Sequence, residues 1–205
     1  MLLVKQFTNS VYQSNSWILY KKKSPTVWLI DCGDAEPILD WLNNEQKTIG
    51  GIFLTHTHYD HIFGLNDLDD ALPGILIYTS EEGKKSLVNS KWNFSHYHQV
   101  NFVFEKTNVV TVVDKTQIEL FPGTDMKVIS TPGHDWSCIT FKTENYLFTG
   151  DSYIPGLKVV TTFPKSNRQQ AAESLQKIKQ VFTSETVICP GHGKMSHSRE
   201  IANTK

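Results

Sequence analysis

The chain has 205 residues, of which 39% are hydrophobic and 20% are charged. These proportions are those of a globular protein, and they exclude disorder and collagen-like repeats. The 20 basic and 21 acidic residues leave a net charge of -1. Because binding to DNA or RNA favours an excess of positive charge, we expect no nucleic-acid partner. The length predicts a single domain over residues 1–205.

The cysteines and the N-terminal segment indicate a cellular compartment. Cys32, Cys138 and Cys189 form no CxxC pair, so they are read as free thiols in a reducing environment. The segment Met1–Phe7 carries neither a basic leader nor a long apolar run. No apolar run of the sequence approaches the ~20 residues that a membrane helix needs. We therefore expect a cytoplasmic protein with no membrane partner.

Short strands dominate the predicted elements, with three helices between them. Ile38, Leu39 and Leu42 recur at helical spacing, which predicts a helix over Glu36–Gln46. Further helices are expected over Ser80–Asn89 and from a cap at Ser166 or Asn167 to Phe182, and Lys91–Gln99 is expected to be irregular. The expected strands are Leu2–Phe7, Val11–Tyr20, Val27–Ile30, Ile52–Thr55, Ile75–Tyr78, Val109–Val113, Gln117–Phe121, Lys127–Thr131, Ile139–Phe141, Tyr146–Thr149 and Thr186–Cys189.

An H-x-H-x-D-H string over residues 56–61 follows the predicted strand Ile52–Thr55. In an extended chain, side chains two residues apart point the same way, so His56 and His58 can grip one ion. If the chain then turns into a helix, Asp60 and His61 move toward a neighbouring position. The string contains no cysteine, which argues against a closed structural zinc site and favours an open catalytic one. Imidazole and carboxylate ligands suit zinc, and also iron or manganese.

Three further candidate ligands follow apolar runs: His134, Asp151 and His192. In open α/β sheets, ligands collect outside the carboxyl ends of the strands. This shared placement is the reason to join these three residues to the string at one metal site. A solvated polar loop or exposed turns would be the alternative interpretation of the same residues.

Four motifs in this order resemble those of the metallo-β-lactamase-fold hydrolases: the string at 56–61, T-P-G-H at 131–134, F-T-G-D at 148–151 and P-G-H-G at 190–193. The resemblance implies an α/β (α+β) fold, a four-layer αββα sandwich with the metal site at one edge of two packed sheets. Carried over by position, it implies two divalent metal ions, with zinc favoured over iron or manganese. The implied ligands are His56, His58 and His134 for metal 1, Asp60, His61 and His192 for metal 2, and Asp151 as the bridge.

The resemblance also implies a reaction. A hydroxide held by the two metals would cleave a small ester-like substrate, with Asp60 as a catalytic residue that orients it. The residues of these motifs are most similar to those of the glyoxalase II-like branch, which hydrolyses thioesters such as hydroxyacylglutathione. Full-length members carry a C-terminal helical region, whereas this chain ends twelve residues after Gly193. The family's lysine and tyrosine after the bridging aspartate are matched only by Lys158, with Val160 at the tyrosine position.

Other functions stay open on the same ligand set. A persulfide dioxygenase with a single iron, a lactonase, a phosphodiesterase and a non-catalytic binding module are the alternatives. We expect a small-molecule substrate, and the sequence sets no oligomeric state. His96 and His98 are expected to lie in a surface loop, with lining of a substrate pocket as the alternative. Asp31 is expected in a plain turn at a strand end, and the alternative is a hydrogen bond from its carboxylate to a ligating histidine.

Overall fold

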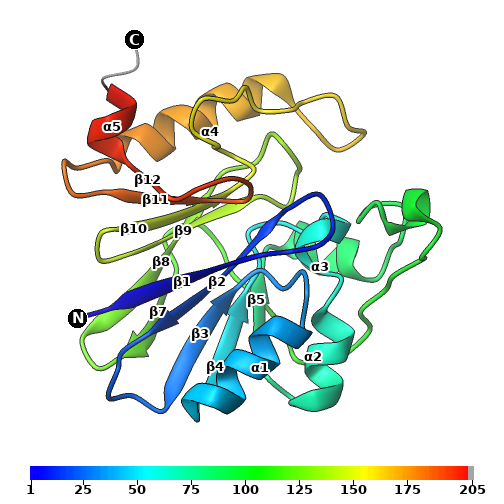
Figure 1. The fold of residues 1–205 in the computed structure, drawn as a ribbon. Coiled ribbons are helices and arrows are strands. Elements are labelled where there is room, and N and C mark those ends of the chain that lie inside the picture. The colour runs from blue at the N-terminus through cyan, green and yellow to red at the C-terminus, as the bar shows by residue number, and fades with distance from the viewer. Residues whose placement is uncertain (203–205) are drawn as a thin grey trace.

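The fold consists of two mixed six-stranded sheets packed face to face, with helices outside each sheet (Figure 1). The computed structural model describes residues 1–202. Neighbouring strands follow the order β1-β2-β3-β4-β5-β6 in the first sheet and β12-β11-β10-β9-β8-β7 in the second. The chain therefore completes one sheet before it begins the other, and each sheet contributes its own strand ends to the edge where the candidate ligands lie.

The first sheet begins with antiparallel strands and continues with parallel ones. A turn between residues 20 and 26 joins β2 to β3 as an antiparallel hairpin. From β3 onward the strands run parallel, so β3 and β4 end at the same edge. The strands are β1 Leu3–Thr8, β2 Asn15–Tyr20, β3 Thr26–Ile30, β4 Thr48–Phe53, β5 Ile77–Thr79 and β6 Val109–Thr111.

The second sheet is antiparallel except for one parallel pair, β10 with β11. That pair brings the residues that follow β10 and β11 to a common edge, since parallel strands end on the same side. The strands are β7 Gln117–Phe121, β8 Thr124–Ser130, β9 Ile139–Thr143, β10 Tyr146–Gly150, β11 Val187–Pro190 and β12 Ser196–His197.

Helices cover the outer faces of both sheets. Figure 1 shows α1 and α2 beside the first sheet and α4 across the second. The helices are α1 Glu36–Glu45, α2 Leu65–Ala71, α3 Glu81–Leu87, α4 Arg168–Gln180 and α5 Ser198–Ala202, with 3-10 turns η1 Tyr59–His61 and η2 Ser95–His98. Among the described residues, no helix has the length and apolar character needed to cross a membrane.

Three hydrophobic cores separate the four layers. One core joins the first sheet to its helices through residues such as Ile18, Leu29 and Ile38. A second lies between the sheets, and a small third core packs Ile178 of α4 on Leu147. Three cores between four layers confirm the expected αββα sandwich.

Most predicted elements are present, although β12, α5 and the 3-10 turn η2 were not predicted and three further differences have a physical reason. The strand expected from Val11 starts only at Asn15, because Tyr12 and Gln13 adopt left-handed backbone angles and form a turn. Strand β4 begins earlier than expected, at Thr48, and its two glycines lie against Trp28. Helix α2 was not predicted, because three aspartates in seven residues lower its helix propensity. The expected cap is confirmed at Asn167, whose side chain accepts hydrogen bonds from the backbone N–H groups of Gln169 and Gln170.

The core between the sheets sets the stability of the edge that carries the site. Phe53 is fully buried there, with its ring centroid 4.9 Å from Tyr78 and 5.1 Å from Phe141. We predict that Phe53→Ala lowers the free energy of unfolding by about 3–5 kcal/mol, because it leaves a cavity between the sheets. Urea unfolding followed by circular dichroism measures the change. The exposed Val113→Ala is the control and is expected to stay within about 0.5 kcal/mol of the unsubstituted chain; equal effects of the two substitutions would contradict the prediction.

Candidate metal centre

The H-x-H-x-D-H string folds as the spacing predicts. After β4 the chain stays extended to His58, whose backbone has φ -66° and ψ 147°. It then forms η1, which carries Asp60 and His61. The change from extended chain to helical turn is what separates the first two histidines from the last two ligands.

All seven candidate ligands lie at one edge of the sandwich. They fall into three overlapping groups whose ligand atoms lie within 4.8 Å of one another in each group. The groups are His56 with His58 and His134, His56 with His61 and Asp151, and Asp60 with His61 and His192. The string follows β4 of the first sheet, whereas His134, Asp151 and His192 follow β8, β10 and β11 of the second sheet. Both sheets therefore contribute to the site.

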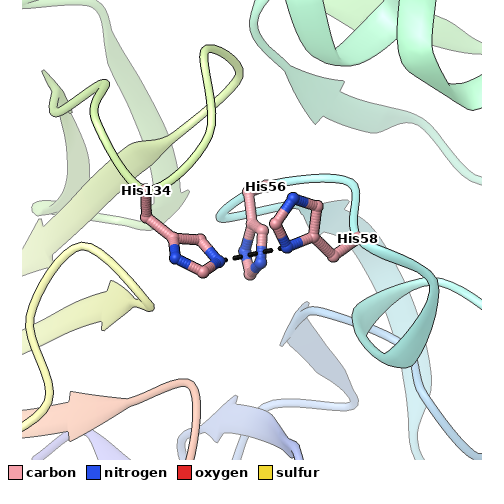
Figure 2. Close-up of side chains that lie close together, drawn as sticks. All are labelled: His56, His58 and His134. Atoms are coloured by element: carbon pink, nitrogen blue, oxygen red, sulfur yellow. Dashed lines mark hydrogen bonds between the residues drawn. The ribbon is translucent and has the colours of Figure 1, made fainter. Parts of the chain in front are cut away.

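The first group consists of three imidazoles that face one another (Figure 2). Nε2 of His134 lies 3.1 Å from Nδ1 of His58. The ring of His56 stands edge-on to both, with centroids 4.6 Å from His58 and 5.3 Å from His134. Three converging imidazole nitrogens are a ligand set suited to a zinc, iron or manganese ion.

The other two groups each add one carboxylate, Asp151 in the second and Asp60 in the third. Oδ2 of Asp60 lies 3.4 Å from Nε2 of His61 and 3.3 Å from Nε2 of His192. Oδ1 of Asp151 lies 3.7 Å from Nε2 of His61, and its Oδ2 lies 3.5 Å from Nε2 of His134. Asp151 thus faces ligands of all three groups, which fits the bridging position that the resemblance implied.

Each of the five histidines also directs its other ring nitrogen away from the centre, toward an oxygen. This pattern is typical of metal ligands, because the outer hydrogen bond fixes the tautomer and the ring orientation. Four of these contacts are hydrogen bonds: His56 Nδ1 with Thr55 Oγ1 at 3.1 Å, His61 Nδ1 with Asp31 Oδ2 at 3.0 Å, His134 Nδ1 with the Val160 carbonyl at 3.0 Å, and His192 Nδ1 with the Tyr12 carbonyl at 3.2 Å. Nε2 of His58 faces Oδ2 of Asp135 at 3.5 Å and forms no hydrogen bond with it.

Buried atoms without a hydrogen-bond partner test whether metal ions fit this site. Nε2 of His56, Nε2 of His61 and Oδ1 of Asp151 have no such partner among the described residues. Buried polar atoms are otherwise nearly always paired, so atoms that converge unpaired fit an ion. Gly191 makes the approach possible, since a Cβ there would overlap the carboxylate of Asp151. The His and Asp clusters therefore fit a dinuclear metal site, and they leave the identity of the metal open.

The protonation of these groups follows from their burial and their neighbours. Burial lowers the pKa of His61, but the charges of Asp60 and Asp31 outweigh this and raise it to about 9. Burial likewise acts against protonation of His192, while hydrogen bonds to Asp151 and Asp60 raise its pKa to about 10. Burial holds the pKa of His56 well below its usual value, and it lowers that of His134 to about 4. Without metal at pH 7, His61 and His192 carry protons and His56 and His134 do not.

Asp31 supports the candidate ligands. The plain turn favoured there is wrong, and the alternative, a hydrogen bond from its carboxylate to a candidate ligand histidine, is what the structure shows. Its carboxylate accepts hydrogen bonds from the backbone N–H and the hydroxyl of Thr55, both at 2.7 Å, and from His61. Because the hydroxyl of Thr55 donates its hydrogen bond to Asp31, its oxygen can accept a hydrogen bond from Nδ1 of His56. Asp31 thus orients two candidate ligands, and its place at the end of β3, beside β4, was the only signal in the sequence.

A cavity of about 580 Å³ opens onto the centre, and five of the seven candidate ligands line it: His58, Asp60, His134, Asp151 and His192. His98 also lines it, so the expected surface-loop position is wrong for this residue. His96 instead points to the side chain of Asn101, and Lys158 is exposed and not part of the lining. Asp135, which directly follows a predicted ligand, had no signal of its own in the sequence.

We predict that Asp31→Asn lowers metal affinity by about 10- to 100-fold, because the neutral amide holds His61 and Thr55 less firmly. Competition with a chelating dye measures the affinity. Asp40→Asn, at an exposed position on α1, removes the same charge without touching the site and is expected to change nothing. Equal affinities of the two variants would contradict the role of Asp31.

We predict that metal binding at pH 7 releases about two protons, since a ligating imidazole must be neutral and His61 and His192 are protonated beforehand. Metal affinity should therefore rise with pH up to about 9 to 10. Calorimetric titration in two buffers of different ionisation enthalpy counts the protons. In the metal-free chain the charge of His61 stabilises the fold fully below its ordinary value of 6.5, and this stabilisation is lost as the pH rises through about 9. A titration without proton release at pH 7 would refute these protonation states.

Comparisons with known proteins agree with the fold and the site. The sequence profile of the Metallo-beta-lactamase superfamily matches residues 9–192. A hydroxyacylglutathione hydrolase of Pseudoalteromonas translucida is 29% identical over 140 residues, which make up 68% of this chain and 46% of that protein. The chain thus spans about half the length of this curated relative.

Two solved structures share the fold. The crystal structure of the BLEG-1 B3 metallo-beta-lactamase superposes with a TM-score of 0.85 at 24% identity, covering 95% of this chain and 94% of that one. The structure of TTHA1623 in a di-iron-bound form gives a TM-score of 0.82 at 22% identity, covering 98% of both chains. At such identities these two likenesses show the fold alone. The profile match, which extends over nearly the whole chain, shows that this chain belongs to the metallo-beta-lactamase superfamily.

Proposed function

We propose that the chain is a metal-dependent hydrolase that cleaves a small ester-like substrate, with a thioester as the favoured class. The observation that carries the proposal is that five candidate ligands line one cavity of about 580 Å³. A substrate in that cavity lies directly against the metal centre, as an open catalytic site requires and a closed structural site does not. The hydroxyacylglutathione hydrolase relative supports the thioester class.

Zinc is the favoured metal, with iron or manganese as alternatives, because the ligands are imidazoles and carboxylates without cysteine. Two such ions would supply a Lewis acid for the substrate oxygen and a water whose pKa is lowered to about 7. The solved structure described in a di-iron-bound form keeps iron among the candidates.

Asp60 would orient the nucleophile. Burial raises the pKa of its carboxyl, but the charge of His61 and a hydrogen bond from His192 hold it below the usual value. Asp60 therefore stays ionised at neutral pH and accepts hydrogen bonds instead of donating them. With one oxygen between His61 and His192, it is anchored on the centre and also lines the cavity.

The leaving group gives a second reason to favour a thioester. A thiol has a pKa of about 8.5, so a thiolate departs without a proton from an acid. An amine or alcohol leaving group would need a proton donor. The two carboxyl groups at the centre, Asp60 and Asp151, have lowered pKa values, and His61 and His192 must be neutral when they bind metal. None of the four therefore serves as that donor near neutral pH.

We predict that Asp151→Ala abolishes hydrolysis and lowers the metal content, because Asp151 faces ligands of all three groups. Activity and metal per chain, by elemental analysis, are the two measurements. His96→Ala is the control, since His96 lies outside the cavity lining, and it is expected to leave both largely unchanged.

The substrate class is tested by a panel of thioesters, lactones and phosphodiesters on protein loaded with zinc, iron or manganese. Thioester hydrolysis as the fastest reaction supports the proposal. One iron per chain with oxygen uptake on a persulfide, a faster lactone or phosphodiester, or full activity of Asp151→Ala would each overturn it.

A further inference from the structure

The cavity at the metal centre has aromatic and apolar walls. Its floor is formed by the five candidate ligands that line it. Its walls come from four segments of the chain: the turn before β2, η1, the loop that includes η2, and the loop before α4. The wall residues are Tyr12, Tyr59, Phe94, Tyr97, His98, Val160, Phe163 and Pro164.

Two phenylalanines stand against the first group of histidines. The ring of Phe94 lies 4.6 Å from that of His58, and Phe163 lies 5.4 Å from His58 and 5.6 Å from His134. The two phenylalanine rings are 5.1 Å apart. A group bonded to a carbonyl carbon that reacts beside His58 and His134 can therefore pack against Phe94 or Phe163. Such rings favour apolar and aromatic groups and offer no partner to an anion.

The mouth of the cavity exposes aromatic surface to water. Tyr12 is 69% exposed, Tyr97 is 66% exposed and Phe163 is 38% exposed, although all three line the cavity. His98 lies between Tyr12 and Tyr59, at 5.3 and 5.1 Å from their rings. A gathering of exposed aromatic side chains at a cavity mouth marks a binding surface for an apolar group.

The backbone holds two of these aromatic residues in an unfavourable conformation. Tyr12 has φ 52° and Phe94 has φ 66°, a left-handed region that side chains other than glycine rarely adopt. Strained backbone kept by the surrounding structure is concentrated at functional sites. The loops are also tied together, because the ammonium of Lys165 lies 4.6 Å from the ring of Trp92 and 4.0 Å from that of Trp136. The aromatic walls are thus placed by the fold.

The lining carries no fixed positive side chain. Within residues 1–202, neither lysine nor arginine lines the cavity, and the charged side chains there are the candidate ligands themselves. Glutathione at neutral pH carries two carboxylates, and tight binding of carboxylates relies on arginine or lysine donors. The tyrosine hydroxyls and His98 can donate hydrogen bonds, but no lysine or arginine of the lining would neutralise those carboxylates.

We propose that this cavity selects a thioester whose acyl group is apolar, such as an arylacetyl group held against Phe94 and Phe163, and whose thiol part carries no negative charge. This inference rests on the proposed thioester hydrolysis and specifies its substrate class. The proposed substrate class differs from the hydroxyacylglutathione for which its hydrolase relative is named. In the reaction, water adds its oxygen to the acyl carbon and the carbon–sulfur bond breaks, giving a carboxylic acid and a thiol.

The test compares three thioesters on the metal-loaded full chain: the phenylacetyl and acetyl thioesters of N-acetylcysteamine, which is a neutral thiol, and S-lactoylglutathione. We expect kcat/KM for the phenylacetyl thioester to exceed that for S-lactoylglutathione by at least about tenfold. Phe163→Ala should lower kcat/KM for the phenylacetyl thioester by about tenfold, chiefly through KM, and should change that for the acetyl thioester by less than about threefold. Leu157→Ala, exposed in the neighbouring loop and outside the lining, is the matched control.

A second variant adds the missing charge without disturbing the core. Tyr97→Lys, at an exposed position of the mouth, should raise kcat/KM for S-lactoylglutathione relative to the phenylacetyl thioester, whereas Val113→Lys, exposed outside the lining, should not. If S-lactoylglutathione is hydrolysed as fast as the neutral thioester by the unsubstituted chain, or if Phe163→Ala affects all three substrates equally, the inference is wrong and the proposed function stands. If no thioester is hydrolysed by the metal-loaded chain, the proposed function fails and the inference fails with it.

Discussion

One buried carboxylate, that of Asp31, orients much of the metal centre. It is 1% exposed and accepts hydrogen bonds from Thr55 and His61. Burial raises its pKa, and the interaction with His61 acts in the opposite direction, so its ionised form depends on that neighbour. Through His61 directly and through the hydroxyl of Thr55, it orients His56 and His61, which between them belong to all three ligand groups. All three ligand groups therefore depend on the same carboxylate. The backbone of Asp31 adopts a left-handed φ of 55° at this position.

The centre also depends on how the two sheets meet. Ser14 and Asn15 at the start of β2 are buried polar residues that bridge to the second sheet and to η1. The hydroxyl of Ser14 donates to the carbonyl of Asp60 at 2.5 Å. The side chain of Asn15 donates to the carbonyl of Pro190 at 3.0 Å, next to the turn that carries His192. These contacts between the sheets set the separation between Asp60 and His192. They explain why the string at 56–61 and the turn after β11, far apart in the sequence, can hold one ion together.

The sequence was informative where chemistry is local and uninformative where it depends on tertiary contacts. The H-x-H-x-D-H string predicted its own geometry, because strand and helical turn alone decide where those side chains point. His134, Asp151 and His192 could be joined to it because each follows a strand. Asp31 reads as a turn residue, since only the pairing of β3 with β4 places it beside Thr55. The start of β2 was placed too early, because nothing local distinguishes Val11 and Tyr12 from a strand, whereas the bridge from Ser14 to His192 fixes the turn.

The floor and the walls of the cavity have different physical origins, and this difference bears on specificity. The floor is built from side chains at strand ends, where register and sheet pairing leave little freedom. The walls are side chains of loops, which tolerate change without loss of the fold. Phe94 and Phe163 come from two such loops and nevertheless meet within 5.1 Å over the same histidine. A single floor can therefore serve several chemistries in this superfamily, while the choice of substrate follows from the loops that each chain places above it. Within residues 1–202 the lining that these loops form presents rings and neither lysine nor arginine, so the selectivity that we propose comes from apolar contact and shape.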